Sequence, residues 1–476
     1  MTYLNILQNL IHKKRAIFAI SISIAVLVSL PITIFAKWNI CFVGLIALLG
    51  IALYFSLKPK NGVILYLLVI APIYPTLRNI ILKVSDIPGP VLSIWQDMGI
   101  YLLIIASLLR GAKNDIDIKF QKLDIIVLSI FLLSVYGAVV SQDIFLSIYG
   151  FRLTYLPICF YFIVRLLHYN YIDVQKFTTF LINTSFLIAI IGMVLYFIFP
   201  NIYFIMTEET IAPEYYSIKR MYSIFWSPVV FGSLMALNTV MTFTLINSEN
   251  KTTSLRKTML RLQFFIFCFC LALSMSRGSW LFAVTGIFTC TILKKSSVKF
   301  LFTVILILLV MFCFFSFRPF YGALKSAIST KGARYQWAFE TIENIKRAPF
   351  GVGLGKAGHV AARFAKTEKH ENIKTSSTDS WYLKIALETG IWSLGLFLMF
   401  MLAAFFFSYK AYLYTKIPKL KAIYLGIMGA FIGFSAQGIG SNVWDFYMVA
   451  PIFWVLLGFV GSYKSMEKDY ALYNNH

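Results

Sequence analysis

The stretch FTTFLINTSFLIAIIGMVLYFI, residues 177–198, contains no charged residue and is long enough to cross a membrane as a helix. A transmembrane helix needs about 20 apolar residues to cross roughly 30 Å of hydrocarbon. Similar blocks recur along the chain, in which 59% of the 476 residues are hydrophobic and 13% are charged. Helices satisfy their own backbone polar groups in lipid. The sequence therefore predicts a single all-α polytopic membrane domain over residues 1–476.

The apolar blocks predict about 12–14 transmembrane helices. We place the candidate spans at residues 15–36, 38–57, 61–79, 92–110, 122–141, 151–168, 177–198, 224–246, 261–276, 279–294, 298–317, 381–408, 420–438 and 446–463. The first block is too long for a signal-peptide core and has no clear cleavage site, so we interpret it as an uncleaved span.

Charge patterning predicts which side of the membrane each loop faces. The formal net charge is +23, and most lysines and arginines lie in short loops between apolar blocks. Their clusters fall on alternate loops, as the positive-inside bias requires, which predicts two cytoplasmic termini. This distribution argues against nucleic-acid binding as the reason for the charge. The six cysteines lie inside apolar blocks without a CxxC pair, so neither a zinc site nor a disulfide framework is predicted.

A long loop at 318–379, set among the last four spans, is predicted on the extracytoplasmic side. Its roughly 60 residues far exceed the usual connection between packed helices, which suggests a functional segment. Residues 333–345 have helical spacing, and Pro349 with the glycines 351, 353 and 355 ends that pattern. The loop is rich in lysine and arginine. It can be a solvated surface near anionic lipid head groups, or a pocket for an anionic substrate.

Four arginines stand singly where spans meet the predicted outer surface: Arg152, Arg220, Arg277 and Arg334. An ionisable residue at membrane depth is costly and is a functional hypothesis by default. Each side chain could instead extend to the interface. Four arginines on one side favour the functional interpretation.

The sequence around these arginines resembles the bacterial O-antigen ligase and polymerase superfamily over roughly residues 150–460. The motifs that carry the resemblance are Arg220 with Phe225, Pro228 and Gly232; Ser276-Arg277-Gly278; Arg334 and Trp337 leading to Gly351, Gly353 and Gly355; and the stretch from Asp379 to Gly390. In ligases the last element is similar to His, then Asn, Ser or Gln, nine residues and Gly. Here Asp379 replaces the His, which favours a polymerase over a ligase.

The resemblance implies a metal-independent membrane glycosyltransferase with no cofactor. Its donor would be a glycan on a polyprenyl pyrophosphate carrier, and its acceptor another lipid-linked glycan or, for a ligase, lipid A core. It also implies the bacterial cytoplasmic (inner) membrane with an extracytoplasmic active face. A chain-length regulator protein is a possible partner, and membrane lipid surrounds the chain.

The candidate residues fit this chemistry on physical grounds. Negative charge grows on the pyrophosphate as the glycosidic bond breaks, and preorganised donors stabilise such charge. We expect Arg152, Arg220, Arg277 and Arg334 to share this role. Asp379 is the candidate general base, although Asp is also a preferred helix N-cap; His359 is the alternative base.

A rival function from a different class is a lipid-linked oligosaccharide flippase or other transporter. Transporters place charges near the bilayer midplane and are often built from two related halves. The sequence shows neither feature. No Asp-x-Asp pair or His cluster suited to a metal occurs on the predicted outer side.

Overall fold

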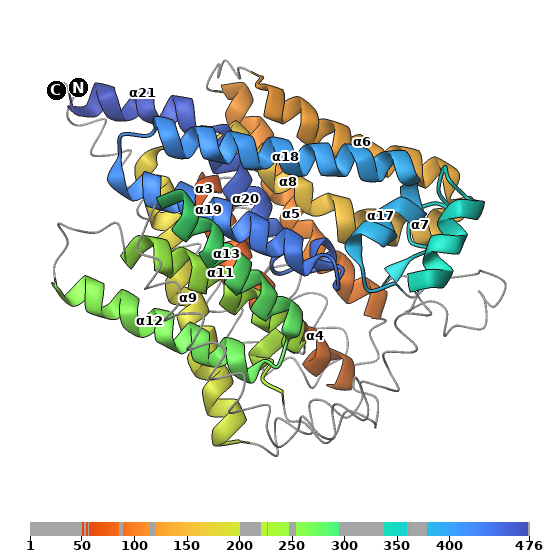
Figure 1. Cartoon of the computed structure of the whole chain (residues 1–476), viewed down its shortest axis with the longest axis horizontal. Coiled ribbons are helices and arrows are strands. Elements are labelled where there is room, and N and C mark those ends of the chain that lie inside the picture. The colour runs from red at the N-terminus through yellow and green to blue at the C-terminus, as the bar shows by residue number, and fades with distance from the viewer. Residues whose placement is uncertain are drawn as a thin grey trace. The chain divides into compact units, whose positions relative to one another are not determined.

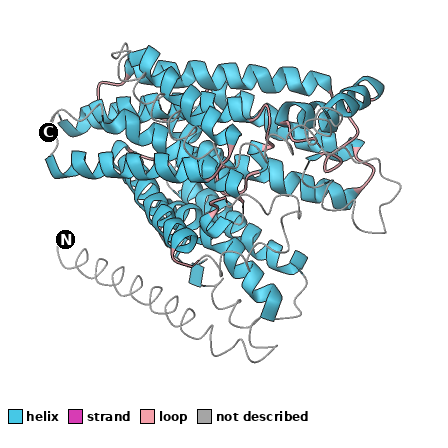
Figure 2. Ribbon diagram, turned by 60° about the horizontal axis from the view of Figure 1, so that its bottom comes forward, coloured by secondary structure: helices cyan, strands magenta, loops and turns pink. Residues whose placement is uncertain are grey.

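A computed structural model describes residues 50–51, 54–55, 57–84, 89–113, 120–199, 220–225, 227–246, 254–294, 338–358, 361 and 378–474. Within these ranges the chain forms helices joined by turns, and no strand occurs (Figure 2). The all-α prediction is thereby confirmed. The chain divides into two compact units, Met1–Ile118 with Leu166–His168, and Lys119–Arg165 with Tyr169–His476.

The first unit contains a helical hairpin. Its elements are α3 (Pro59–Leu65), the π-helical turn η1 (Tyr66–Ile70), α4 (Ala71–Val84) and α5 (Gly89–Lys113). Glycines allow these helices to approach closely. A Cβ on Gly99 would lie 2.3 Å from Cε2 of Tyr66, and one on Gly62 would lie 3.1 Å from Cδ2 of Leu103.

The second unit carries every candidate site residue that the structure describes. Its helices are α6 (Lys122–Val140), α7 (Ile144–Gly150), η2 (Phe151–Tyr155), η3 (Leu156–Ile158), α8 (Cys159–Leu167), α9 (Tyr171–Phe197), η5 (Ser223–Phe225), α11 (Pro228–Ile246), α12 (Ser254–Leu273), α13 (Arg277–Lys294), α17 (Trp381–Thr389), α18 (Ile391–Tyr414), α19 (Pro418–Gln437), η7 (Val443–Asp445), α20 (Ala450–Gly461) and α21 (Tyr463–Asn474) (Figure 1).

Seven helical stretches among the described residues are long and apolar enough to cross a membrane. They are Pro59–Ile81, Lys122–Val140, Ile144–Leu167, Tyr171–Phe197, Pro228–Ile246, Ile391–Tyr414 and Pro418–Gln437. The predicted spans 92–110, 261–276, 279–294 and 446–463 fall on α5, α12, α13 and α20. The predicted spans 15–36 and 298–317, and most of 38–57, lie outside the described residues. The total of 12–14 spans therefore stays a prediction.

The predicted span 381–408 is corrected by the structure. It is two helices, α17 and α18, separated at Gly390. Gly390 has φ of 94°, in the left-handed half of conformational space that residues with a Cβ rarely adopt. The Gly390 N–H donates to Ala386 O at 3.0 Å. The apolar run hid this break, and α17 lies outside the seven candidate spans.

The core of the second unit is built on close contact between α13 and α19. A Cβ on Gly286 would lie 2.9 Å from Gly429 O, and one on Gly429 would lie 2.6 Å from Gly286 O. A Cβ on Gly433 would lie 2.4 Å from Phe282 O. Small residues at helix interfaces let backbones approach where lipid supplies no hydrophobic drive for association. This contact fixes the start of α13 beside the end of α19, where the candidate site lies.

Candidate functional site

The turn between α12 and α13 carries Arg277. Met275 in this turn has φ of 49°, a conformation that is uncommon for a residue other than glycine. The hydroxyl of Ser274 donates to Leu271 O at 2.7 Å and accepts from the backbone N of Ser276 at 3.4 Å. Arg277 follows as the first residue of α13, and its side chain is exposed. The turn therefore holds a cationic side chain at the accessible end of α13.

Arg220 lies against the same turn. Its Nε donates to Ser274 O at 3.2 Å, and the backbone N of Met221 donates to Leu273 O at 2.9 Å. Arg220 is half-buried. The structure thus brings Arg220, from a different segment, into contact with the turn that directly precedes Arg277.

A network of neutral polar side chains supports this turn from inside the helix bundle. Gln437, the last residue of α19, is buried, and its Nε2 donates to Ser233 at 2.8 Å and to Ser279 at 3.2 Å. The hydroxyls of Ser276 and Ser279 are 2.8 Å apart. Buried polar groups need such partners. Gln437 therefore joins α11, α13 and α19 beneath the arginines.

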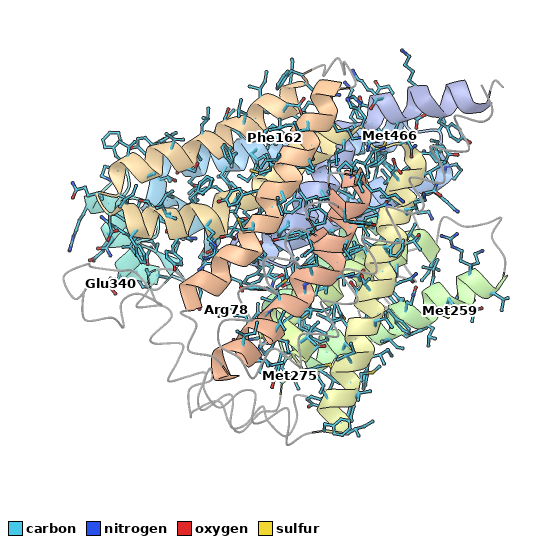
Figure 3. The ribbon with its side chains drawn as sticks, turned by 180° about the vertical axis from the view of Figure 1, so that it is seen from behind. Arg78, Phe162, Met259, Met275, Glu340 and Met466 are labelled. Carbon is cyan, nitrogen blue, oxygen red and sulfur yellow. The ribbon has the colours of Figure 1, made fainter. Side chains whose placement is uncertain are left out.

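Two glycines in the sequence motifs have a packing explanation here. A Cβ on Gly232 would lie 2.8 Å from the hydroxyl oxygens of both Ser274 and Ser279. A Cβ on Gly278 would lie 3.2 Å from Cγ of Gln437 and 3.6 Å from Oγ of Ser441. The motif glycines thus make room for the turn and its supporting network. In Figure 3, Met275 of this turn is labelled in the lower part of the view and Met466 of α21 in the upper part.

Asp379 lies immediately before α17. Ser380 occupies the N-cap position of this helix without a side-chain capping hydrogen bond, so the alternative role of Asp379 as the N-cap is not what the structure shows. Asp379 is half-buried between two contacts to the end of α19. Asn442 Nδ2 donates to Thr378 O at 2.8 Å, and Trp381 N donates to Gly438 O at 3.0 Å.

Arg152 lies in η2, a π-helical turn between α7 and η3. Single π-helical turns within longer helices often occur at functional sites. Arg152 is half-buried, and its guanidinium carbon lies 5.8 Å from the centroid of the Tyr149 ring. Two residues on, Thr154 donates its hydroxyl to Asp445 Oδ1 at 2.7 Å.

These contacts share one element, residues 437–445, which we call the 437–445 segment. Its Gln437 supports the turn with Arg277 and Arg220, its Gly438 and Asn442 contact the residues around Asp379, and its Asp445 binds the turn with Arg152. The structure thus brings the segments that carry four predicted site residues to one short connection.

Two further predicted site residues, Arg334 and His359, lie outside the described residues. Of the loop 318–379 the structure describes residues 338–358, 361 and 378–379, of which 338–347 are helical. Glu340 of this helix is labelled in Figure 3. The prediction of a partly helical loop agrees with this stretch.

Sequence reasoning missed the buried charges beside Asp379. The Nζ of Lys384 lies 2.6 Å from Oδ2 of Asp445 and 3.9 Å from Oε2 of Glu388, and its side chain has no exposed surface. The charge of Lys384 within an apolar block could have marked it, because such residues are functional candidates by default. Asp445 lies 61 residues further along the chain, so the ion pair between them could not be predicted from local sequence.

The pKa values of Lys384 and Glu388 are shifted because two carboxylates, Asp445 and Glu388, lie near one buried ammonium. Burial raises the pKa of the Glu388 carboxyl to about 7; the nearby Lys384 opposes this shift, and Asp445 adds to it. Burial acts to lower the pKa of Lys384, but the attraction of Asp445 and Glu388 outweighs it, so the net shift is upward. Among the described residues, no three His, Cys, Asp or Glu side chains gather as a metal ion would require.

Comparison with known proteins supports the family that the motifs resemble. Residues 262–399 match the family described as O-antigen ligase. The matched range contains Arg277, Asp379 and Lys384, whereas Asp445 follows it. No curated protein sequence matched the chain. The match confirms the resemblance to the O-antigen ligase and polymerase superfamily.

Proposed function

We propose that this member of the O-antigen ligase and polymerase superfamily is a polymerase. It joins polyprenyl-pyrophosphate-linked oligosaccharide repeat units into O-antigen, capsule or exopolysaccharide. The reaction takes place on the extracytoplasmic face of the bacterial cytoplasmic membrane, with both termini in the cytoplasm. The family match supports glycosyl transfer of the ligase or polymerase type.

One observation carries the proposal: a cationic turn and a carboxylate meet at the same connection. Gly278, next to Arg277, lies beside Gln437 and Ser441. Trp381, two residues after Asp379, donates to Gly438 O. Arg277 and Asp379 therefore lie on segments that contact residues 437–441 from two helices. Glycosyl transfer from a pyrophosphate needs this combination of a cation and a base.

The arginines act on the leaving group. The acceptor hydroxyl oxygen attacks the anomeric carbon, and the bond from that carbon to the pyrophosphate oxygen breaks. Polyprenyl pyrophosphate leaves with the electron pair, so negative charge grows on its oxygens. Arg277, Arg220 and Arg152 stabilise this charge, because guanidinium groups bind phosphate oxygens in pairs. Arg334 has the same proposed role.

Asp379 receives the proton of the acceptor hydroxyl. A carboxylate acts as a general base when it is positioned next to that hydroxyl. The ligase pattern has His at this position, so the Asp favours an acceptor that is another lipid-linked repeat unit. His359 is the alternative base. Transfer to lipid A core is the second candidate function, because the matched family, described as O-antigen ligase, is compatible with both reactions.

The partners follow from the reaction. Donor and acceptor are both glycans on a polyprenyl pyrophosphate carrier, and their lipid tails lie in the surrounding bilayer. A chain-length regulator protein is a possible further partner. No nucleic acid takes part.

Complementation in the host tests the proposal. The gene is deleted and then restored as wild type, Arg277→Ala or Asp379→Asn, and the surface glycan is separated on a gel. We expect single repeat units on the normal acceptor in the deletion strain and in both variants, at normal protein level. Arg261→Ala is the matched control, because Arg261 is an exposed arginine in the N-terminal half of α12, away from the turn that follows this helix.

Other outcomes discriminate between the functions. Loss of all surface glycan with accumulation of lipid-linked polymer would identify a ligase. A glycan of normal length and amount in the deletion strain would exclude both enzymes and favour a transporter.

A further inference from the structure

Lys384 is the centre of a buried polar group that the reaction described above does not use. We call Lys384, Asp445, Thr154 and Glu388 the Lys384 junction. The lysine Nζ donates to both carboxylate oxygens of Asp445, at 2.6 and 2.8 Å, and to the Thr154 hydroxyl at 3.1 Å. An ammonium has three hydrogens to donate. All three therefore have an acceptor inside the protein.

Glu388 extends the junction to the outer loop. Its Oε1 accepts from the backbone N of Gly355 at 3.1 Å and of Ala357 at 3.2 Å. Gly355 has φ of 82°, and a Cβ there would lie 2.3 Å from Leu146 O. The glycine turn after the loop helix is thus fixed against α7 on one side and against Glu388 on the other.

Each arm of the junction adjoins a residue or segment of the candidate site. Lys384 follows Asp379 by little more than one helical turn, and Thr154 follows Arg152 by two residues. Asp445 ends the 437–445 segment, whose Asn442 binds the main chain just before Asp379. Three chain segments with separate tasks therefore meet at one ammonium, and Glu388 connects the glycine turn to the same group.

Stability alone is a poor reason for such a group. The desolvation of buried ions offsets much of their attraction, and apolar side chains of similar volume often serve as well. Directional ionic hydrogen bonds do fix geometry. A displacement of about 1 Å in a catalytic arrangement can lower the rate by about 100-fold.

We propose that the Lys384 junction positions Asp379 and Arg152 relative to one another and fixes the glycine turn of the outer loop beside them. Its four members are positioning residues that do not touch the reacting atoms. The catalytic roles of Asp379 and Arg152 in this proposal rest on the function proposed above. The statement that the junction holds these chain segments together does not depend on that function.

The kinetic test uses Thr154→Val, which removes one hydroxyl and keeps the shape. The lipid-linked repeat unit that accumulates in the deletion host is extracted and reconstituted in vesicles with the purified full chain. We expect kcat to fall by 10-fold or more, KM to change less than 2-fold, and Thr154→Ser to restore the rate. The matched control is Thr178→Val, a buried threonine whose hydroxyl donates only within its own helix. Equal kcat for both valine variants would overturn the proposal.

A second measurement does not depend on activity. Hydrogen exchange by mass spectrometry compares wild type with Lys384→Met. We expect faster exchange at residues 351–357 and 378–384, with a larger increase there than in α11. An increase at 351–357 no larger than the increase in α11 would refute a junction that links these segments. If the wild-type protein forms no polymer, the proposed function is wrong. The exchange measurement still tests whether the Lys384 junction holds these segments together.

Discussion

The two sides of the candidate site are held in opposite ways. The turn with Arg277 rests on hydroxyls, a carboxamide and main chain, through Gln437, Ser233 and Ser279. The helix after Asp379 rests on an ion pair of Lys384 with Asp445. The side chains that support the Arg277 turn are uncharged, whereas Lys384 is paired with a carboxylate. This contrast agrees with the proposed roles, anion binding for Arg277 and positioning for Lys384.

Lys384→Met gives the largest expected effect on this comparison. It leaves Asp445 and Glu388 buried without their cation, which costs about 3–5 kcal/mol. Denaturant unfolding of the purified chain in detergent measures the loss. Lys468→Met, at an exposed lysine of α21, should stay within about 0.5 kcal/mol of wild type. A loss below about 1 kcal/mol for Lys384→Met would show that the pair is not effectively buried.

Glu388→Gln tests the ion-pair side of the site through the pH dependence of the unfolding free energy. Burial raises the pKa of Glu388 to about 7, so between pH 4.5 and 7 the folded protein keeps a proton that the unfolded chain releases. Unfolding free energy then falls as pH rises through this window, by on the order of 3 kcal/mol for this group. Unfolding curves at several pH values should show a shallower slope for Glu388→Gln. An identical slope in both proteins contradicts the shift.

Gln437→Leu tests the neutral side. The side chain keeps its approximate volume but no longer serves the hydroxyls of Ser233 and Ser279, and unsatisfied buried groups cost about 1–3 kcal/mol. The same unfolding measurement should therefore show a smaller loss than Lys384→Met. The comparison fails if the two losses are equal.

Ser276→Ala has the smallest expected effect. It removes one hydroxyl that pairs with Ser279 at 2.8 Å, a bond worth about 0.5–1.5 kcal/mol. We expect measurable polymer from this variant in the complemented host, because Arg277 keeps its place at the start of α13. Loss of all polymer at normal protein level would show that the serine does more than support the turn.

The helices and the arginine turn were predictable from local sequence. Apolar blocks predicted most of the long helices of the described chain, although not α21, and Ser276-Arg277-Gly278 marked the break between α12 and α13. The Lys384 junction was not predicted, because its ion pair joins residues 61 positions apart. The break at Gly390 was not predicted, because the candidate span was extended across it although α17 contains the charged residues Lys384 and Glu388. The features that local sequence did not predict thus depend on contacts between distant residues, as in the Lys384 junction, or on backbone conformation, as at Gly390.

The order of the chain gives the 437–445 segment a consequence for biosynthesis. Arg152, Arg220, Arg277 and Asp379 all precede it in the sequence. A chain that emerges from its N-terminus therefore enters the membrane with its proposed chemical groups complete but unassembled. The enzyme would stay inactive during insertion and become competent only when α19 and the residues after it are in place. A nascent chain stalled after α18 should then be harmless to the lipid-linked glycans around it.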